Sequence, residues 1–168
     1  MLIRDESETD WAAISDVHRR AFDADGEPRL VEALRVAGRL AVSLVAVLND
    51  AVVGHIAFST VTIDAQPQPV VGLGLAPVGV LPGMQGRGIG SALIRAGLDQ
   101  CKEKSARFVV VLGNPGYYRR FGFKTAADWG IGNEYGAHEE FMALELSPGA
   151  IPSPAGIARY SPEFLLVS

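Results

Sequence analysis

A glycine-dense segment, Gln85–Ser91 (QGRGIGS), carries the residues of this chain that are best suited to bind an anion. An apolar run precedes it and an apolar pattern of helical spacing follows it, so the segment is expected to join a buried strand to the start of a helix. Glycines let the backbone approach an anion closely, and the unpaired N–H groups at a helix start point toward it. The segment therefore predicts a phosphate-binding loop.

The spacing within this loop separates three kinds of phosphate site. A P-loop requires lysine and then serine or threonine after its last glycine, whereas Gly90 is followed by serine and alanine. A dinucleotide fingerprint requires G-x-G-x-x-G and an acidic residue about 20 positions further on, but this chain has G-x-G-x-G and its next acids fall inside the predicted helix. The pattern that remains is Gln85-x-x-Gly88-x-Gly90.

A tyrosine motif follows one predicted helix later. The segment 109–123 reads as a hydrophobic strand, a short helix and a Gly-Phe pair. Tyr118 lies four positions before Gly122, which gives the pattern Tyr-x-x-x-Gly-Phe. The two motifs together are more specific than either one alone.

In order and spacing, these motifs resemble those of the GNAT N-acetyltransferase superfamily, and in particular its small bacterial branch of predicted acetyltransferases without an assigned substrate. The resemblance covers about residues 1–147. It implies an α/β (α+β) fold with a mixed, mostly antiparallel central sheet, flanked by helices and splayed between the fourth and fifth strands. It also implies an enzyme that moves an acetyl group from acetyl-CoA to a primary amine by direct attack.

The resemblance implies a site for acetyl-CoA, the acyl donor, and no metal. A bulge at Gly79 would open the wedge between the fourth and fifth strands, where main-chain groups of Val78 and Val80 would hold the pantetheine arm. The residues that the resemblance assigns to the pyrophosphate loop and its surroundings are Gln85, Gly86, Arg87, Gly88, Gly90, Ser91 and Asn114.

Tyr118 is the residue expected to act on the leaving group. The thioester is electrophilic enough for an amine to attack it directly, and the chain has no G-x-S-x-G, H-E-x-x-H or C-x-x-C motif. By resemblance, Tyr118 would be the general acid toward the sulfur of coenzyme A, a kind of assistance that contributes roughly 10²–10⁴-fold. The alternative is a packed tyrosine whose hydroxyl bonds to a carbonyl.

The acceptor side offers no clear base. In the family, the first two helices and the loop between them form one wall of the acceptor site, and Glu27 at the end of that loop is the leading acidic candidate. An ordinary charge at a helix N-terminus explains Glu27 equally well. His18, on a predicted helix face, and His55, on a predicted strand, are expected to be structural, although His55 or a water chain could also serve as the base. The acceptor is expected to be a small-molecule or peptide amine, but the sequence does not identify it.

Predicted strands and helices along the chain would position the candidate site residues. Hydrophobic periodicity, caps and turn residues predict the elements. Gly54 indicates a bulge or a close backbone approach inside the third strand. The predicted strands are 2–4, 41–48, 51–63, 70–80, 107–112 and 139–146, and the predicted helices are 11–22, 27–37, 87 or 88 to 104, and a short one over 117–121.

Composition limits the class of protein. The 168 residues fit one domain, the single Cys101 excludes an internal disulfide, and the chain shows neither a signal-peptide pattern nor an apolar run long enough for a membrane span, so a cytoplasmic protein is expected. A proline-containing extension, 148–168, is expected to pack on the domain, and with Trp129 it could support a homodimer.

Charge is distributed unevenly. The net charge of −4 argues against general nucleic-acid binding. Residues 85–124 nevertheless contain eight cations and only two acids. They are interpreted either as a positive wall for a polyanionic cofactor or as solvated helix charges.

Two other functional classes stay open. A non-catalytic acyl-CoA-binding module or sensor could use the same fold, since no base is evident. An unrelated nucleotide-binding protein would be protected against thermal unfolding by ATP or NAD instead of CoA.

Overall fold

Two strands, β3 (Ala51–Ile63) and β4 (Val70–Val80), run through both of the units into which the chain divides. The computed structural model describes residues 1–152 and 155–168, and each unit is described in turn. Ser153 and Pro154, in the predicted C-terminal extension, lie outside the described residues. Unit 1 comprises Met1–Ser59, Ala76–Gln100 and Pro162–Ser168, and unit 2 comprises Thr60–Leu75 and Cys101–Ser161.

The sequence predicted most of these elements to within a residue or two. None of the helices in the described ranges is long and apolar enough to cross a membrane. The helices are α1 (Trp11–Phe22), α2 (Gly26–Val36), α3 (Ile89–Glu103) and α4 (Pro115–Tyr118). The strands are β1 (Leu2–Asp5), β2 (Leu40–Leu48), β3 (Ala51–Ile63), β4 (Val70–Val80), β5 (Phe108–Leu112), β6 (Lys124–Thr125), β7 (Gly132–Asn133), β8 (Phe141–Glu145) and β9 (Ile157–Tyr160).

In unit 1, a tight hairpin sets the register of the antiparallel strands β1, β2 and β3. The turn residues Asn49 and Asp50 have φ of 51° and 61°, the left-handed values that a two-residue hairpin turn requires and that Asn and Asp tolerate. Within the register, Ala46 faces Gly54 and the next pair is Val47 with Val52. One extra residue therefore bulges from β3 beside Gly54, as predicted.

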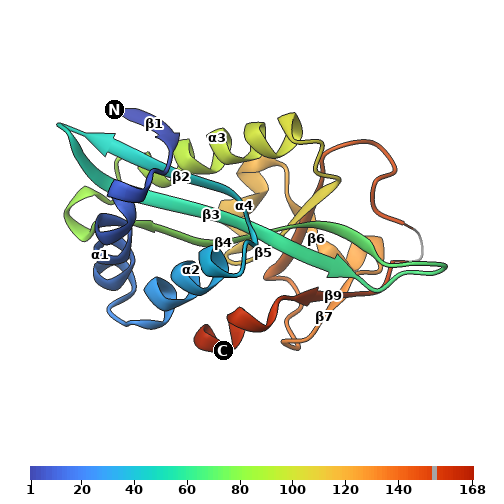
Figure 1. The fold of residues 1–168 in the computed structure, drawn as a ribbon. Coiled ribbons are helices and arrows are strands. Elements are labelled where there is room, and N and C mark those ends of the chain that lie inside the picture. Colours follow the sequence, from blue (N-terminus) through green and yellow to red (C-terminus); the bar gives the residue numbers. More distant parts are fainter. Residues whose placement is uncertain (153–154) are drawn as a thin grey trace. The chain divides into compact units, whose positions relative to one another are not determined.

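Helices cover both faces of these strands, with α1 and α2 on one face and α3 on the other (Figure 1). Ile14 of α1, Val31 of α2 and Val45 of β2 form a buried cluster on the first face. On the second face, a Cβ at Gly54 would lie only 3.0 Å from Leu93 Cδ1 of α3. The glycine therefore lets α3 approach β3 closely.

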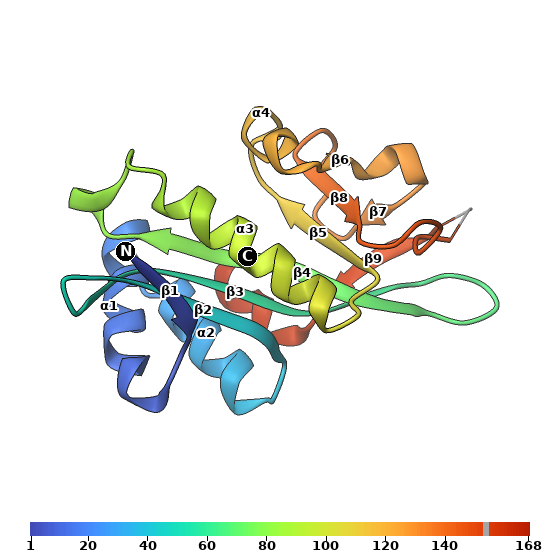
Figure 2. The same cartoon turned by 90° about the horizontal axis from the view of Figure 1, so that it is seen from above.

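Unit 2 is built around β5, which pairs in parallel with β4 and antiparallel with β8 (Figure 2). The pairing of β4 with β5 consists of Leu73 with Val109 and Gly74 with Val110. The last two residues of β5, Val111 and Leu112, have their Cα partners on β8. The short ladder agrees with the expected splay between the fourth and fifth strands.

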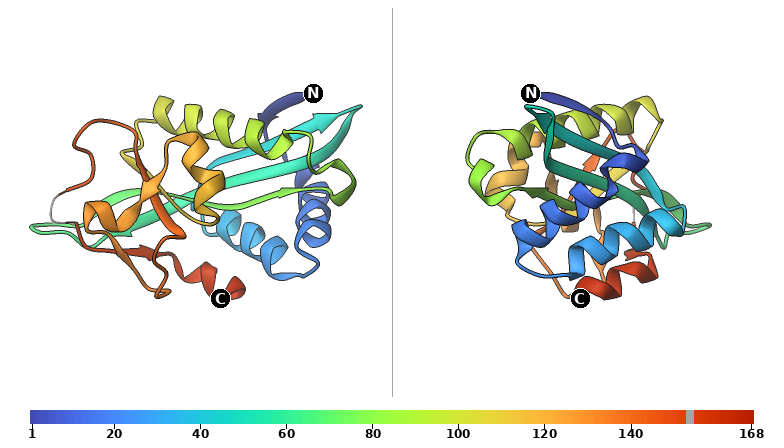
Figure 3. Two further views of the ribbon diagram at one scale, coloured as in Figure 1. Left: turned by 180° about the vertical axis from the view of Figure 1, so that it is seen from behind. Right: turned by 60° about the vertical axis from the view of Figure 1, so that its left-hand side comes forward.

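The C-terminal extension contributes a strand that the sequence analysis missed. In unit 2, β9 pairs antiparallel with the end of β3, from Val61 with Tyr160 to Ile63 with Ala158, and parallel with β7. In unit 1, the final 3₁₀ helix η5 (Pro162–Val167) lies beside α2, as Figure 3 shows. An ion pair of 2.8 Å joins Arg39 to Glu163 there.

Candidate active site

The predicted phosphate loop joins β4 to α3 in unit 1. Gly86 and Gly88 have φ of 75° and 81°, values that side chains other than glycine rarely adopt. A Cβ at either position would meet no heavy atom within 4 Å. Backbone conformation, and not crowding, therefore explains why glycines stand here, and both glycines are exposed.

Helix α3 begins immediately after this loop. Its first turn is closed by the hydrogen bond from Ala92 N to Gly88 O, of 3.0 Å, so the N–H groups of Ile89 and Gly90 precede the first such bond. N–H groups at this position, with the positive end of the helix dipole, form an arrangement that binds anions. Ser91 is buried, whereas Arg87 is exposed beside the loop.

Gln85 has a positioning role in the structure. Its side-chain Nε2 donates a hydrogen bond of 3.0 Å to the carbonyl oxygen of Val80. This contact ties the loop to the end of β4, where Val78 and Val80 are half-buried. Between them lies Gly79, at which a Cβ would be 2.7 Å from Nδ1 of His18. The close approach of α1 gives Gly79 a packing reason in addition to the predicted bulge.

Glu27 is the second residue of α2 and is half-buried. Its Oε2 atom is buried and has no hydrogen-bond partner among the described residues. A carboxylate oxygen that is shielded from water but unpaired is costly unless something binds to it. The structure therefore gives Glu27 a property that an ordinary exposed helix charge lacks.

Two histidines that are 37 residues apart in sequence meet in unit 1. Nε2 of His18 lies 2.7 Å from Nδ1 of His55, and both side chains are 0% exposed. Burial lowers the pKa of each, and for His18 the neighbouring His55 lowers it further. Both were expected to be structural. The sequence analysis named each histidine, but it could not predict that they pair, because the pairing depends on how α1 packs against β3.

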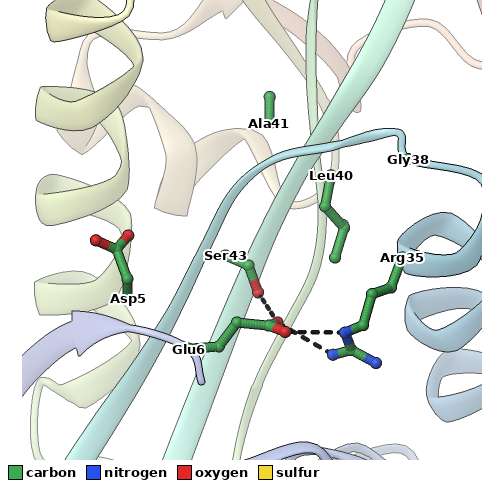
Figure 4. Close-up of a pocket in the computed structure, with 7 residues that line it drawn as sticks. All are labelled: Asp5, Glu6, Arg35, Gly38, Leu40, Ala41 and Ser43. Carbon is green, nitrogen blue, oxygen red and sulfur yellow. Dashed lines mark hydrogen bonds and ion pairs between the residues drawn. The ribbon is translucent and has the colours of Figure 1, made fainter. Parts of the chain in front are cut away.

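Glu6, which the sequence analysis did not single out, lies beside these histidines. Arg35 Nε donates to Glu6 Oε2 at 2.8 Å, and its Nη2 donates to Oε1 at 3.0 Å (Figure 4). Burial raises the pKa of Glu6, but the neighbouring His55 and the hydrogen bonds from Arg35 and Ser43 outweigh burial and hold the pKa well below its usual range. Glu6 is therefore ionised at neutral pH.

Tyr118 lies in unit 2, at the end of α4, and is 8% exposed. Its ring lies over Gly113, where a Cβ would collide with the ring edge, and it packs against Phe123 with ring centroids 5.7 Å apart. Burial, and secondarily Tyr117, raises the pKa of Tyr118 to about 12. The hydroxyl therefore keeps its proton at neutral pH and can donate it or a hydrogen bond.

Asn114 caps α4, because its Oδ1 accepts a hydrogen bond of 3.3 Å from Tyr117 N. Such a cap holds the tyrosine-bearing turn in place. Asn114 is nevertheless exposed, so its Nδ2 group can still donate to a ligand. Cys101 is a buried core residue, and burial raises the pKa of its thiol to about 12.

The eight cations of residues 85–124 are all exposed. Two of them, Arg87 and Arg95, belong to unit 1, and the other six belong to unit 2. In the described part of the chain, no group of three or more His, Cys, Asp or Glu side chains is arranged to hold a metal ion. Val78, Val80, the loop from Gln85 to Ser91, and Glu27 all belong to unit 1, whereas Asn114 and Tyr118 belong to unit 2.

The fold and the loop at the start of α3 define a class of protein: the chain belongs to the GNAT acetyltransferases, since residues 2–126 match the acetyltransferase (GNAT) domain. Among curated proteins, it is similar to YhbS of Escherichia coli (strain K12), an uncharacterized N-acetyltransferase, with 36% identity over 166 residues that cover 98% of each chain. The family, the fold class and the assignment as an enzyme are thereby confirmed.

Two solved structures are similar over nearly the whole chain. The crystal structure of Escherichia coli YhbS in complex with CoA has a TM-score of 0.90 and 35% identity, and covers 98% of this chain and 91% of that one. A GNAT family acetyltransferase from Brucella melitensis, in complex with acetyl-CoA, has a TM-score of 0.81 and 41% identity, and covers 97% of both chains.

Proposed function

We propose that this protein transfers an acetyl group from acetyl-CoA to a primary amine, which attacks the thioester directly. The observation that carries the proposal is the loop at the start of α3, where Gly86 and Gly88 take left-handed conformations ahead of the first helical hydrogen bond. The similar proteins solved with CoA and with acetyl-CoA support this choice of donor.

The donor would be held by backbone groups. The N–H groups from Gly86 to Ser91 would surround the diphosphate, with Arg87 adding a nearby positive charge. Main-chain groups of Val78 and Val80 would hold the pantetheine arm in the manner of an added strand. The contact from Gln85 Nε2 to Val80 O supports this arrangement, because it couples the position of the loop to the end of β4.

Tyr118 would assist departure of the thiolate. The pKa of Tyr118, near 12, lies well above the value of about 8.5 that is usual for a cysteine thiol, so complete proton transfer from Tyr118 to a departing thiolate is uphill. Hydrogen-bond donation to the departing sulfur is therefore the form of assistance that fits the tyrosine best. Such a bond stabilises the charge that develops in the transition state.

Glu27 would face the acceptor. Its unpaired, buried Oε2 can accept a hydrogen bond from an ammonium group and hold the amine for attack. Orienting the amine and the thioester can itself supply a large part of the rate. The chain thus offers a binding role for the carboxylate whether or not it takes the proton.

Thiol release tests the proposal. The purified protein is mixed with acetyl-CoA and a panel of amines, including polyamines, aminoglycosides, and peptides with free N-termini or lysines, and free CoA is measured. We expect amine-dependent release of CoA with at least one acceptor. Binding of acetyl-CoA with no release across the panel would instead favour a non-catalytic acyl-CoA module. Thermal protection by ATP or NAD and not by CoA would overturn both.

A further inference from the structure

Four polar side chains, of which the two histidines are fully buried, form a hydrogen-bonded chain in unit 1, on the face covered by α1 and α2. His18 of α1 contacts His55 of β3 at 2.7 Å, and His55 Nε2 lies 2.8 Å from Ser43 Oγ of β2. Ser43 Oγ in turn donates to Glu6 Oε1. These four side chains therefore cross the strands on one face of the sheet. They extend from Gly79 of β4 to Glu6, which directly follows β1.

The ionised Glu6 fixes the direction of every hydrogen bond in this chain. A carboxylate can only accept, so the single proton of the Ser43 hydroxyl goes to Glu6, and Ser43 must accept from His55 Nε2. The neutral His55 ring then has a bare Nδ1, which accepts from His18 Nε2. It follows that the neutral His18 ring carries no proton on Nδ1.

This bare Nδ1 of His18 is a buried acceptor with no hydrogen-bond partner among the described residues. It faces Gly79, where the absence of a side chain leaves the ring against the backbone of β4. Unpaired buried polar atoms are rare and are often explained by function. The directions of these hydrogen bonds therefore leave a lone pair on His18 Nδ1, beside Gly79 of β4, which lies between Val78 and Val80.

At the opposite end of this hydrogen-bonded chain, an ion pair with Arg35 holds Glu6 in place. Glu6 pairs with Arg35 and lines a cavity of about 320 Å³ together with Asp5, Gly38, Leu40, Ala41, Ser43 and Arg35 (Figure 4). The side chain of Glu6 is 13% exposed, in contrast to the fully buried histidines. The ionisable groups that act on the two histidines are each other, Glu6, Arg35 and Asp10.

We propose that His18 Nδ1 is the base that takes the proton from the attacking amine, and that His55, Ser43 and Glu6 are positioning residues that hold its tautomer and compensate its charge. This inference rests on the proposed function, in which Val78 and Val80 hold the acyl donor. It supplies the base that the sequence analysis could not find.

In the proposed step, the acceptor attacks as the neutral amine, after its ammonium proton has been lost to solvent. The amine nitrogen forms a bond to the thioester carbon, and its surplus proton moves to Nδ1 of His18. The resulting imidazolium is stabilised through His55 and Ser43 by the Glu6 carboxylate, as an orienting carboxylate stabilises a catalytic imidazolium elsewhere. When the C–S bond breaks, Nδ1 releases the proton toward the thiolate, which leaves as the thiol, and His18 returns to its starting tautomer.

A purely structural role is the alternative, because satisfied buried networks also stabilise a single packing arrangement. Two measurements separate the roles. The first is the ¹⁵N shifts of the histidine rings in the wild-type protein. We expect the proton of His18 on Nε2 with a bare Nδ1, and the proton of His55 on Nε2. The reverse tautomers would overturn the proposal directly, with no dependence on activity.

The second measurement compares Ser43→Ala with Ser43→Thr, which keeps the hydroxyl. For Ser43→Ala we expect kcat to fall by about tenfold or more with the KM for acetyl-CoA unchanged, since one positioned group is lost. The acidic limb of its kcat/KM profile should move to lower pH, because an imidazolium uncoupled from Glu6 is less stable. Ser43→Thr should restore the rate and the profile.

The outcomes keep this proposal distinct from the proposed function. Should the wild-type protein transfer acetyl groups while Ser43→Ala retains its rate within about twofold and its pH profile, only the role of the histidine chain fails. Should the wild-type protein bind CoA but acetylate no amine, the proposed function fails, and the base role of His18 fails with it. His18→Gln, which removes the acceptor nitrogen, should lose most of the turnover and keep CoA affinity.

Discussion

At the scale of single residues, the structure separates groups that can react from groups that hold others in place. Tyr118 keeps its proton, with a pKa raised to about 12, whereas the partly buried Glu6 keeps its charge. The sequence motif marked Tyr118 as a candidate. It could not reveal the link from His18 to Glu6, because that link depends on three elements packing together and on residues that match no motif.

Replacing Tyr118 with phenylalanine should lower kcat by roughly 10²-fold, because the hydrogen bond to the departing sulfur is lost. CoA affinity should stay within about twofold, since the hydroxyl acts on the leaving group and not on the diphosphate. Tyr117→Phe is the matched control, because it removes a neighbouring hydroxyl from the same helix. Steady-state kinetics and CoA titration of both variants check this expectation. Equal turnover in Tyr118→Phe and the wild type would remove the tyrosine from the mechanism.

Replacing Glu27 with glutamine should raise the KM for the amine by about tenfold, because a charge-assisted hydrogen bond is worth about 1.5–3 kcal/mol. The KM for acetyl-CoA should not change. Glu32→Gln, an exposed position on the same helix, is the control for a general loss of negative charge. If both variants weaken amine use equally, long-range attraction by the acidic surface, and not a contact at Glu27, explains the effect.

At the scale of elements, the segments with a clear local pattern of apolar and turn residues are the ones whose bounds were predicted correctly. The nearly all-apolar run Val70–Val80 was predicted with the correct ends, and β3 with its bulge was predicted as well. β9 was missed because its four residues lie in a proline-containing tail, and its pairing with β3 bridges almost 100 residues. The glycines of the phosphate loop could be recognised in the sequence, because few residue types other than glycine adopt a positive φ.

Replacing Gly88 with valine should weaken CoA binding by at least about tenfold. At φ of 81°, a β-branched residue is strained by about 1–2 kcal/mol and also places bulk beside the amides. Gly38→Val controls for strain alone, since Gly38 has φ of 70° and open space around it but lies outside the loop. Calorimetric titration with CoA and urea unfolding are measured for both variants. Equal CoA affinity in the two variants would show that the loop does not bind CoA.

At the scale of the whole molecule, the buried ionisable groups make folding sensitive to acid. His18 and His55 stay neutral in the folded chain because burial lowers each pKa. Asp10 stays ionised, since hydrogen bonds from Arg4 and Ser7 lower its pKa to about 2. In each case, the unfolded chain binds more protons than the folded chain as the pH falls. All of these groups therefore weaken the folded state in acid.

Stability should be full above the unfolded histidine pKa of about 6.5 and fall below it toward the lowered pKa values of the folded chain. Two histidines give a slope approaching 2.7 kcal/mol per pH unit, with Asp10 and Glu6 adding to it only below about pH 4.5. Urea unfolding between about pH 7.5 and pH 5 measures the slope. His55→Gln should reduce it, with the exposed His138→Gln as the control. A flat profile over this range would contradict buried neutral histidines.

We propose that backbone amides at the start of α3 hold the diphosphate of an acyl-CoA. Titrating the ¹⁵N-labelled protein with CoA and following its amide signals measures this directly. We expect the largest shifts, saturating with one equivalent of CoA, at the amides of Gly86, Arg87, Gly88, Ile89 and Gly90. Saturable binding that leaves these five signals in place and shifts amides elsewhere would show that the diphosphate is held by another part of the chain.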